Sequence, residues 1–213
     1  MRRTWLDSPA EHALTGAVAE LESGSAVEVV IAVRRIARPW ARVPLAAGAV
    51  SAWATLAFML YGAPTFSLAS FLVDPVLVGL LAAAATTVIA PPLRWFVPAA
   101  ARRRAAASAA RATFVVRGVH RTHARTVVLV YCALAEQMAA VVPDTGVAGA
   151  LPAAVLTEWE RRIEQAIAHG GAATADAIRS IAPVLGAALP RAHDDRNELP
   201  DAVEHDVHRR PRR

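Results

Sequence analysis

The feature that most constrains this chain is a long stretch almost without charge. Between Arg42 and Arg94, only Asp74 is charged. The first part, residues 43–62, is apolar over the roughly 20 residues that a helix needs to cross the hydrocarbon core of a bilayer. A turn and a second apolar segment follow. The pattern predicts a two-helix transmembrane hairpin over residues 43–97, with the lipid bilayer as its first partner.

The second membrane helix has two possible starting points. Asp74-Pro75 is typical of an N-cap followed by a first-turn proline, which favours a start at Asp74. Alternatively, the helix starts at Phe66 and carries Asp74 inside the membrane. We favour the first, because a lone carboxylate within a membrane helix costs roughly 2.5–3.5 kcal/mol on insertion scales.

Arginine residues gather on both sides of the apolar stretch and are absent from its central turn. They are Arg34, Arg35, Arg38 and Arg42 before it, and Arg94, Arg102, Arg103 and Arg104 after it. By the positive-inside rule, both termini are expected in the cytoplasm and the chain in the cell (inner) membrane. The N-terminus carries no apolar secretion signal, which agrees with this orientation.

The composition indicates which class of partner the chain binds. The net charge is +5 and there is no lysine, and many of the arginines flank the apolar stretch, where anionic lipid headgroups explain them better than nucleic acid does. We therefore predict no nucleic-acid partner. The single cysteine, Cys132, excludes an internal disulfide and lies in a β-branched run that predicts burial.

The remaining segments predict a soluble α/β domain that the hairpin interrupts. Its first part, residues 1–42, starts a helix at the capping box Ser8-Pro9-Ala10-Glu11 and continues to a strand. Its second part is residues 98–190, and residues 191–213 form a charged tail with few apolar residues, expected to be disordered. The expected elements are helices 8–24, 99–117, 152–168 and 174–189, and strands 26–33, 126–133 and 138–142. A small α/β/α sandwich is the natural arrangement.

Three pieces of the sequence resemble the TPM domain family. They are Glu20-Leu-Glu-Ser-Gly-Ser-Ala-Val-Glu-Val-Val30, Gly118-Val-His-Arg-Thr-His-Ala-Arg-Thr-Val-Val-Leu-Val130 and Val142-Pro-Asp-Thr-Gly-Val147. The resemblance covers residues 8–190 and is greatest to a bacterial membrane subfamily with two inserted transmembrane helices. It implies an α/β/α sandwich and a phosphatase domain of weak acid activity, Ca²⁺ binding, or help in assembling and repairing membrane complexes. The chain departs from the family pattern where Pro143 precedes Asp144 in place of glycine.

One group of polar residues forms a candidate site. A right-handed crossover makes strand 126–133 parallel to strand 26–33. The turn at residues 134–137 reverses the chain, so strand 138–142 runs antiparallel to strand 126–133. The start of strand 126–133 and the turn after residue 142 therefore meet at one edge of the sheet. Phosphoester hydrolysis at this edge needs an Arg clamp, a carboxylate and an acid. The candidates for these roles are His120, Arg121, Arg125 and Asp144. The alternative is that Asp144 only caps a turn and that the cations are solvated.

Metal binding and a carboxylate cluster are weaker signals. Asp144 with His123 is the candidate metal pair, for Ca²⁺ or another divalent ion, although nothing nearby completes a shell and no cofactor is certain. On helix 152–168, Glu158 is placed to pair with Arg161 and Arg162. The apolar residues of the same helix, including Trp159, form a stripe that is expected to face the core. We interpret Glu158, Glu160 and Glu164 as surface ion-pairing residues.

Two functions follow from the sequence. The first is a membrane-anchored interaction or assembly module at the cytoplasmic face with a membrane-protein partner, because no complete catalytic set is apparent. The second is a weak, metal-assisted phosphatase that uses Asp144. The sequence favours the first and leaves the oligomeric state open.

Overall fold

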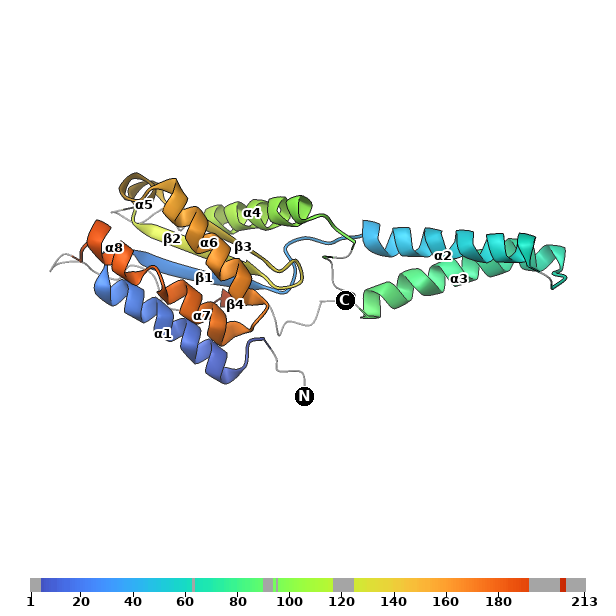
Figure 1. Ribbon diagram of the computed structural model, residues 1–213, viewed down its shortest axis with the longest axis horizontal. Helices are drawn as coiled ribbons and strands as arrows, with labels where there is room; N and C mark the ends of the chain where they lie inside the picture. The colour runs from blue at the N-terminus through green and yellow to red at the C-terminus, as the bar shows by residue number, and fades with distance from the viewer. Residues whose placement is uncertain are drawn as a thin grey trace. The chain divides into compact units, whose positions relative to one another are not determined.

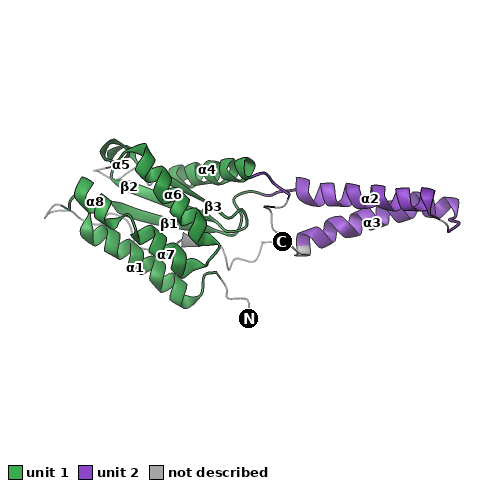
Figure 2. Ribbon diagram, in the orientation of Figure 1, with its two compact units in different colours: residues 1–38, 99–213 green, residues 39–98 purple. Residues whose placement is uncertain are grey.

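The structure, a computed structural model, falls into two compact units (Figure 2). It describes residues 5–62, 64–89, 94, 96–116, 125–191 and 204–205. We call Met1–Arg38 with Ala99–Arg213 the α/β unit, and Pro39–Pro98 the hairpin unit.

The α/β unit combines helices with one mixed sheet (Figure 1). Its strands are β1 (Glu28–Arg34), β2 (Val127–Ala133), β3 (Met138–Pro143) and the two-residue β4 (Glu204–His205). Its helices are α1 (Ser8–Gly24), α4 (Ala99–Val116), α5 (Thr145–Ala150), α6 (Ala153–Ile167), α7 (Gly171–Arg179) and α8 (Ala182–Ala188). The predicted mixed α/β class is confirmed.

The sheet has the strand order β3-β2-β1-β4. β1 and β2 are parallel, with Glu28 opposite Val127, and β2 and β3 are antiparallel. Both pairings were predicted from the strand order along the chain. β4 pairs in parallel with Ala32 and Val33 of β1, so the expectation of a wholly disordered tail is wrong at residues 204–205. The rest of that tail after Arg191 lies outside the described residues.

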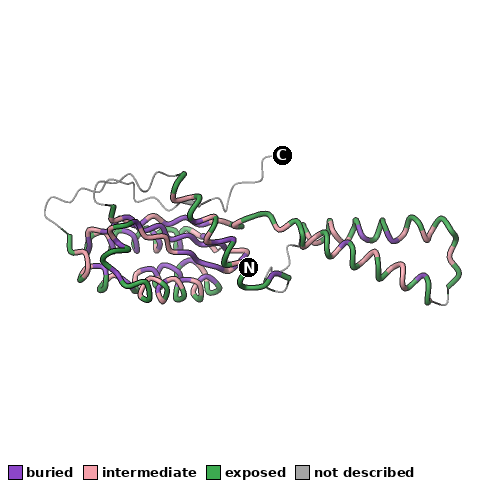
Figure 3. The backbone as a smooth tube through the Cα atoms, turned by 90° about the horizontal axis from the view of Figure 1, so that it is seen from above, coloured by how far each residue is buried: buried purple, intermediate pink, exposed green. Residues whose placement is uncertain are grey.

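Each face of the sheet has its own apolar core. On one face, alternate residues such as Ile31 and Val130 pack with α1, α6, α7 and α8 in the larger core. On the other face, Leu129 and Tyr131 pack against α4, which contributes only alanines to the buried part of that core. Figure 3 shows long buried stretches in the α/β unit, and the residues of β2 are all buried. Burial on both faces explains why β2 is apolar at nearly every position.

Several element boundaries differ from the prediction. The N-cap of α1 is Asp7 and not Ser8, because Asp7 Oδ1 accepts a hydrogen bond from the Ala10 amide at 3.0 Å. The predicted helix 174–189 is two helices. α7 begins at Gly171, where a Cβ would lie 2.6 Å from the Trp5 carbonyl oxygen, so only glycine fits. α8 begins after a break at Ile181, with a proline in its first turn.

The hairpin unit consists of α2 (Arg42–Tyr61) and α3 (Leu68–Ile89), both long and apolar enough to cross a membrane by length and composition. The two helices approach closely at Gly48 and Gly79. A Cβ on Gly48 would lie 2.8 Å from the Gly79 carbonyl oxygen, and one on Gly79 would lie 2.9 Å from the Gly48 carbonyl oxygen. Ala52 and Ala83, each four residues further on, complete a small-residue seam typical of packed membrane helices.

The preferred start of the second apolar helix at Asp74 is wrong. α3 begins at Leu68, with Pro75 inside it, which is close to the alternative start. Ser67 supplies the cap that the prediction assigned to Asp74, because its Oγ accepts a hydrogen bond from the Ser70 amide at 3.1 Å. A proline removes only one hydrogen bond from a long helix, so α3 continues through it. Asp74 therefore lies within the apolar helix.

Candidate site at the Asp144 edge of the sheet

The start of β2 and the end of β3 lie side by side, as the sequence predicted. The Asp144 amide donates to the Val127 carbonyl oxygen at 2.8 Å. The Gly146 amide donates to the Arg125 carbonyl oxygen at 3.0 Å. The backbone thus fixes Asp144, the first turn of α5 and Arg125 at one edge of the sheet.

The carboxylate of Asp144 is buried, and only one of its two oxygens accepts a hydrogen bond. Its side chain is 5% exposed, and Oδ1 accepts a hydrogen bond from the Thr145 amide at 2.6 Å. Oδ2 is also buried, and it has no hydrogen-bond partner in the part of the chain that the structure describes. Asp144 therefore caps α5, as the simpler interpretation held, and it retains one unsatisfied acceptor.

The structure does not show the other predicted site residues around Asp144. His120, Arg121 and His123 lie outside the described residues. Arg125 has an exposed side chain and a left-handed backbone with φ of 50°. No ion pair joins Arg125 to Asp144 across the described ranges. The structure thus brings the Arg125 backbone to the site but not its guanidinium group.

The described residues do not form a metal site at this edge. Ca²⁺ takes six to eight oxygen ligands, and a single free carboxylate oxygen on Asp144 does not supply them. Within the described ranges, no group of three or more His, Cys, Asp or Glu side chains is placed to hold a metal ion. A Ca²⁺ or other divalent ion therefore does not fit the described residues on their own.

At the opposite edge of the sheet, Glu136 is fully buried, which the sequence did not indicate. Both of its carboxylate oxygens accept from the Ala37 amide at 3.1 Å. Its own carbonyl oxygen accepts a hydrogen bond from the Arg102 guanidinium group. Ala37 precedes the hairpin unit along the chain and Arg102 follows it. The β2–β3 turn therefore holds both connections that lead to the hairpin.

Helix carboxylates also bind backbone amides on the edge strand β3 and on β1, at a residue of β1 that lies before its pairing with β4. Glu160 of α6 accepts from the Val141 amide of β3 at 2.9 Å, and Glu22 of α1 accepts from the Val29 amide of β1 at 3.0 Å. Such contacts prevent an exposed strand edge from pairing with another chain. The prediction that Glu160 is a surface ion-pairing residue is therefore wrong.

Comparison with known proteins gives one structural neighbour and no family. No protein-family pattern matches the chain, and no curated protein matches it. The chain is similar in fold to the solution structure of the BA42 protein from the psychrophilic bacterium Bizionia argentinensis, with a TM-score of 0.56. The alignment covers 96% of this chain and 98% of that protein, at 12% sequence identity. At this identity the likeness is one of fold alone.

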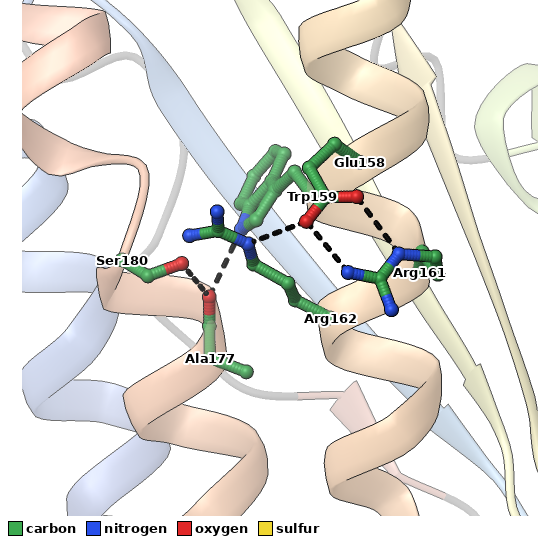
Figure 4. A network of polar contacts seen from close by, with 6 residues as sticks. All are labelled: Glu158, Trp159, Arg161, Arg162, Ala177 and Ser180. Atoms are coloured by element: carbon green, nitrogen blue, oxygen red, sulfur yellow. Dashed lines mark hydrogen bonds and ion pairs between the residues drawn. The ribbon is translucent and has the colours of Figure 1, made fainter.

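The surface of α6 shows how this helix divides its polar and apolar residues (Figure 4). Glu158 binds Arg161 at 2.7 Å and Arg162 at 2.9 Å, as predicted. Hydrogen bonds from Arg161 and then from Arg162 lower the pKa of Glu158 to about 2. Trp159 is buried, as predicted, and its Nε1 donates to the carbonyl oxygens of Ala177 and Ile178 at 3.2 Å. Trp159 thus joins α6 to α7, beside a groove of about 330 Å³ that α8 also lines.

Proposed function

We propose that this chain is a membrane-anchored interaction or assembly module, with its α/β unit held at the cytoplasmic face of the cell membrane. The observation that carries the proposal is the surface of the hairpin unit. Its large apolar side chains point outward, including Trp53 at 76% exposed and Leu80 at 65% exposed. A patch of this extent on a soluble protein is normally covered by a partner or a membrane.

The burial of α2 and α3 argues against a role as core helices. An apolar helix in the core of a soluble protein has most of its residues covered. In the most apolar windows of α2 and α3, only 11% of the residues are buried. Two apolar helices that pack on each other through glycine and alanine, with leucine and valine outside, suit a lipid environment.

The orientation follows from the arginines. Four precede the hairpin's first helix or begin it, and none occurs in the turn between the two helices. The positive-inside rule therefore supports both termini on the cytoplasmic side. Glu136 supports the anchoring role as well, because it ties the β2–β3 turn to the chain on both sides of the hairpin.

The interaction role is favoured over catalysis by the state of the Asp144 edge. Within the described ranges, no cation is paired with the buried Oδ2 of Asp144 at this edge. Kinship with the TPM family remains part of the proposal, and it would suit a role in assembling or repairing membrane complexes.

The test of the interaction role is the mass of the particle extracted from its own membrane. The full chain would be extracted in a gentle detergent, and its protein mass measured by light scattering with a correction for bound detergent. We expect a particle heavier than the 22.5 kDa of one chain. A particle of one chain, obtained in several gentle detergents, would contradict the interaction role.

A second candidate function, phosphoester hydrolysis, is favoured by the unsatisfied Oδ2 of Asp144. The test is phosphate release from a panel of phosphoesters by the detergent-purified chain, with Ca²⁺, Mg²⁺ or a chelator. Turnover that disappears in Asp144→Asn, at an unchanged melting temperature, would support an enzyme. Glu164→Gln, a carboxylate on the outer side of α6, is the matched control. Absence of turnover under every condition would leave the interaction role.

A further inference from the structure

Asp74 occupies an unusual position in the hairpin unit. It is the only charged residue between Arg42 and Arg94, and it lies six residues after Leu68, the first residue of α3. At a rise of 1.5 Å per residue, this places it about 9 Å along the helix from the end next to the turn. If α3 crosses a bilayer, Asp74 lies inside the apolar layer, near its non-cytoplasmic side.

No described residue of the hairpin unit neutralises this carboxylate. Asp74 is half-buried, and the next residue of α3, Pro75, is buried. No hydrogen bond or ion pair reaches its side chain anywhere in the described part of the chain. The chain itself has no Lys, Arg or His between residues 43 and 93 that could pair with it. A charge in this environment is costly unless a partner group is supplied.

Pro75 leaves a second acceptor beside the first. As a proline inside α3, it has no amide hydrogen to donate to the Phe71 carbonyl oxygen one turn earlier. Phe71 and Asp74 are three residues apart and so lie on neighbouring positions of the helix surface. This part of α3 therefore has a carboxylate and a carbonyl oxygen that lacks its usual helix donor. The nearby hydroxyl of Ser70 lies 3.0 Å from the hydroxyl of Ser67 and makes its hydrogen bond there.

These two acceptors define the chemistry of the group that fits them. An arginine side chain has five N–H donors and a permanent charge, so it can bind a carboxylate and a carbonyl oxygen together. We propose that Asp74 is the contact point for a transmembrane helix of another protein that carries an arginine at the same depth. This inference rests on the proposed membrane anchor and names the chemistry of its partner.

A second copy of this chain is a poorer occupant. It would bring another Asp74 and another freed Phe71 carbonyl oxygen, and therefore two more acceptors. The glycine and alanine positions that let helices approach closely are already used between α2 and α3, at Gly48 and Gly79. Charge complementarity thus points to a basic partner helix.

The experiment uses the full chain in vesicles with a synthetic partner of defined chemistry. The chain carries a donor dye at Thr65→Cys, in the turn next to α3, and native Cys132 stays in place because it is fully buried. The partner is a leucine-rich helix of about 24 residues, long enough to span the bilayer, with one arginine about 9 Å from the end that bears an acceptor dye. Energy transfer between the dyes measures association.

We expect energy transfer between the chain and the arginine-bearing helix. Association should be at least about tenfold weaker when the chain carries Asp74→Asn, or when leucine replaces the arginine of the synthetic helix. Asp74→Arg with an aspartate-bearing helix should restore association, which excludes a general defect in folding. Equal transfer with the leucine helix, or in Asp74→Asn, would overturn the proposal. So would an Asp74-dependent self-association of the chain without any added helix.

Flotation of the same vesicles separates failure of this inference from failure of the proposed anchor. A chain that floats with the vesicles but shows no transfer with the arginine helix is anchored and lacks the proposed contact. A chain that does not float contradicts the anchor, and the Asp74 contact with it.

Discussion

The two units of this molecule treat their large apolar residues in opposite ways. In the α/β unit, Leu14, Ile31 and Ile163 are fully buried, and charged residues such as Arg103 and Glu158 are exposed. In the hairpin unit, Trp53 and Leu80 point outward while glycine and alanine form the contact between the helices. Burial of apolar surface stabilises a protein when it removes that surface from water, and a lipid environment provides no such gain. The contrast is expected if water surrounds the first unit and lipid surrounds the second.

The largest effect that this comparison predicts is at Trp159. Trp159→Ala removes a buried indole that joins α6 to α7, and it should lower the free energy of unfolding of the α/β unit by about 3–5 kcal/mol. Trp53→Ala, in the hairpin unit, should change it by less than about 0.5 kcal/mol. Urea unfolding of the detergent-purified chain, followed by circular dichroism, measures both. Equal losses of unfolding free energy in the two variants would contradict the contrast between the two units.

The next effect concerns the surface of the hairpin. In water, Leu80→Arg at an exposed position would be harmless, whereas near the centre of a membrane helix an arginine costs about 2.5–3.5 kcal/mol. We therefore expect Leu80→Arg to lower the fraction of the chain that resists extraction from membranes by alkaline carbonate. Val184→Arg, at an exposed apolar position of α8, is the matched control and should leave this fraction unchanged. The same extraction for both variants would contradict a lipid environment.

A smaller effect is expected where the α/β unit holds the connections to the hairpin. Glu136→Ala leaves the Ala37 amide without its carboxylate acceptor and should destabilise the α/β unit by about 1–3 kcal/mol. Hydrogen exchange at the Ala37 amide should become faster. Glu164→Ala, which breaks a partly exposed pair with Arg103, should cost less than about 1 kcal/mol. Unchanged exchange at Ala37 would show that Glu136 does not hold this connection.

The smallest effect is at the surface pair of α6. The pKa of Glu158 is lowered from its ordinary value of 4.5 to about 2 by hydrogen bonds from Arg161 and Arg162. A lowered pKa stabilises the folded state above pH 4.5, and this contribution is lost as the pH falls from 4.5 toward 2. The contribution is small because the pair is exposed. Glu158→Gln should therefore melt slightly below wild type at pH 7 and together with it at pH 2. A carboxyl that titrates near 4.5 by NMR would disprove the pairing.

The sequence predicted the features that depend on local pattern. The β-branched runs around Ile31 and Val130 identified two buried strands, and the chain order gave their parallel pairing. The spacing of Trp159 and Ile163 identified the buried face of α6. The length of the apolar stretch identified the two helices of the hairpin. Each of these signals is repeated over many residues, so no single contact can reverse it.

The features that the sequence did not predict depend on single contacts between distant residues. Glu136 binds the Ala37 amide 99 residues away, and Glu160 binds β3 from a neighbouring helix. The start of α3 was misplaced because two local caps compete, and Ser67 prevails over Asp74. At the candidate site, the sequence predicted the edge of the sheet and the cap formed by Asp144, but not that its Oδ2 would be left unsatisfied.

Native Cys132 makes a direct test of the anchor and its orientation practical. Burial raises the pKa of its thiol to about 12, so the folded chain should not react with a maleimide at neutral pH. A new cysteine at an exposed position therefore reports its own side of the membrane. Thr65→Cys marks the turn of the hairpin and Ser23→Cys marks α1 of the α/β unit, and both positions are exposed.

The most direct measurement is labelling of these two variants by a membrane-impermeant maleimide in intact bacterial spheroplasts. We predict that Thr65→Cys is labelled in intact spheroplasts, and that Ser23→Cys is labelled only after the membrane is opened. Labelling of Ser23→Cys in intact spheroplasts, or protection of Thr65→Cys until they are opened, would contradict a hairpin that crosses the membrane with both termini in the cytoplasm.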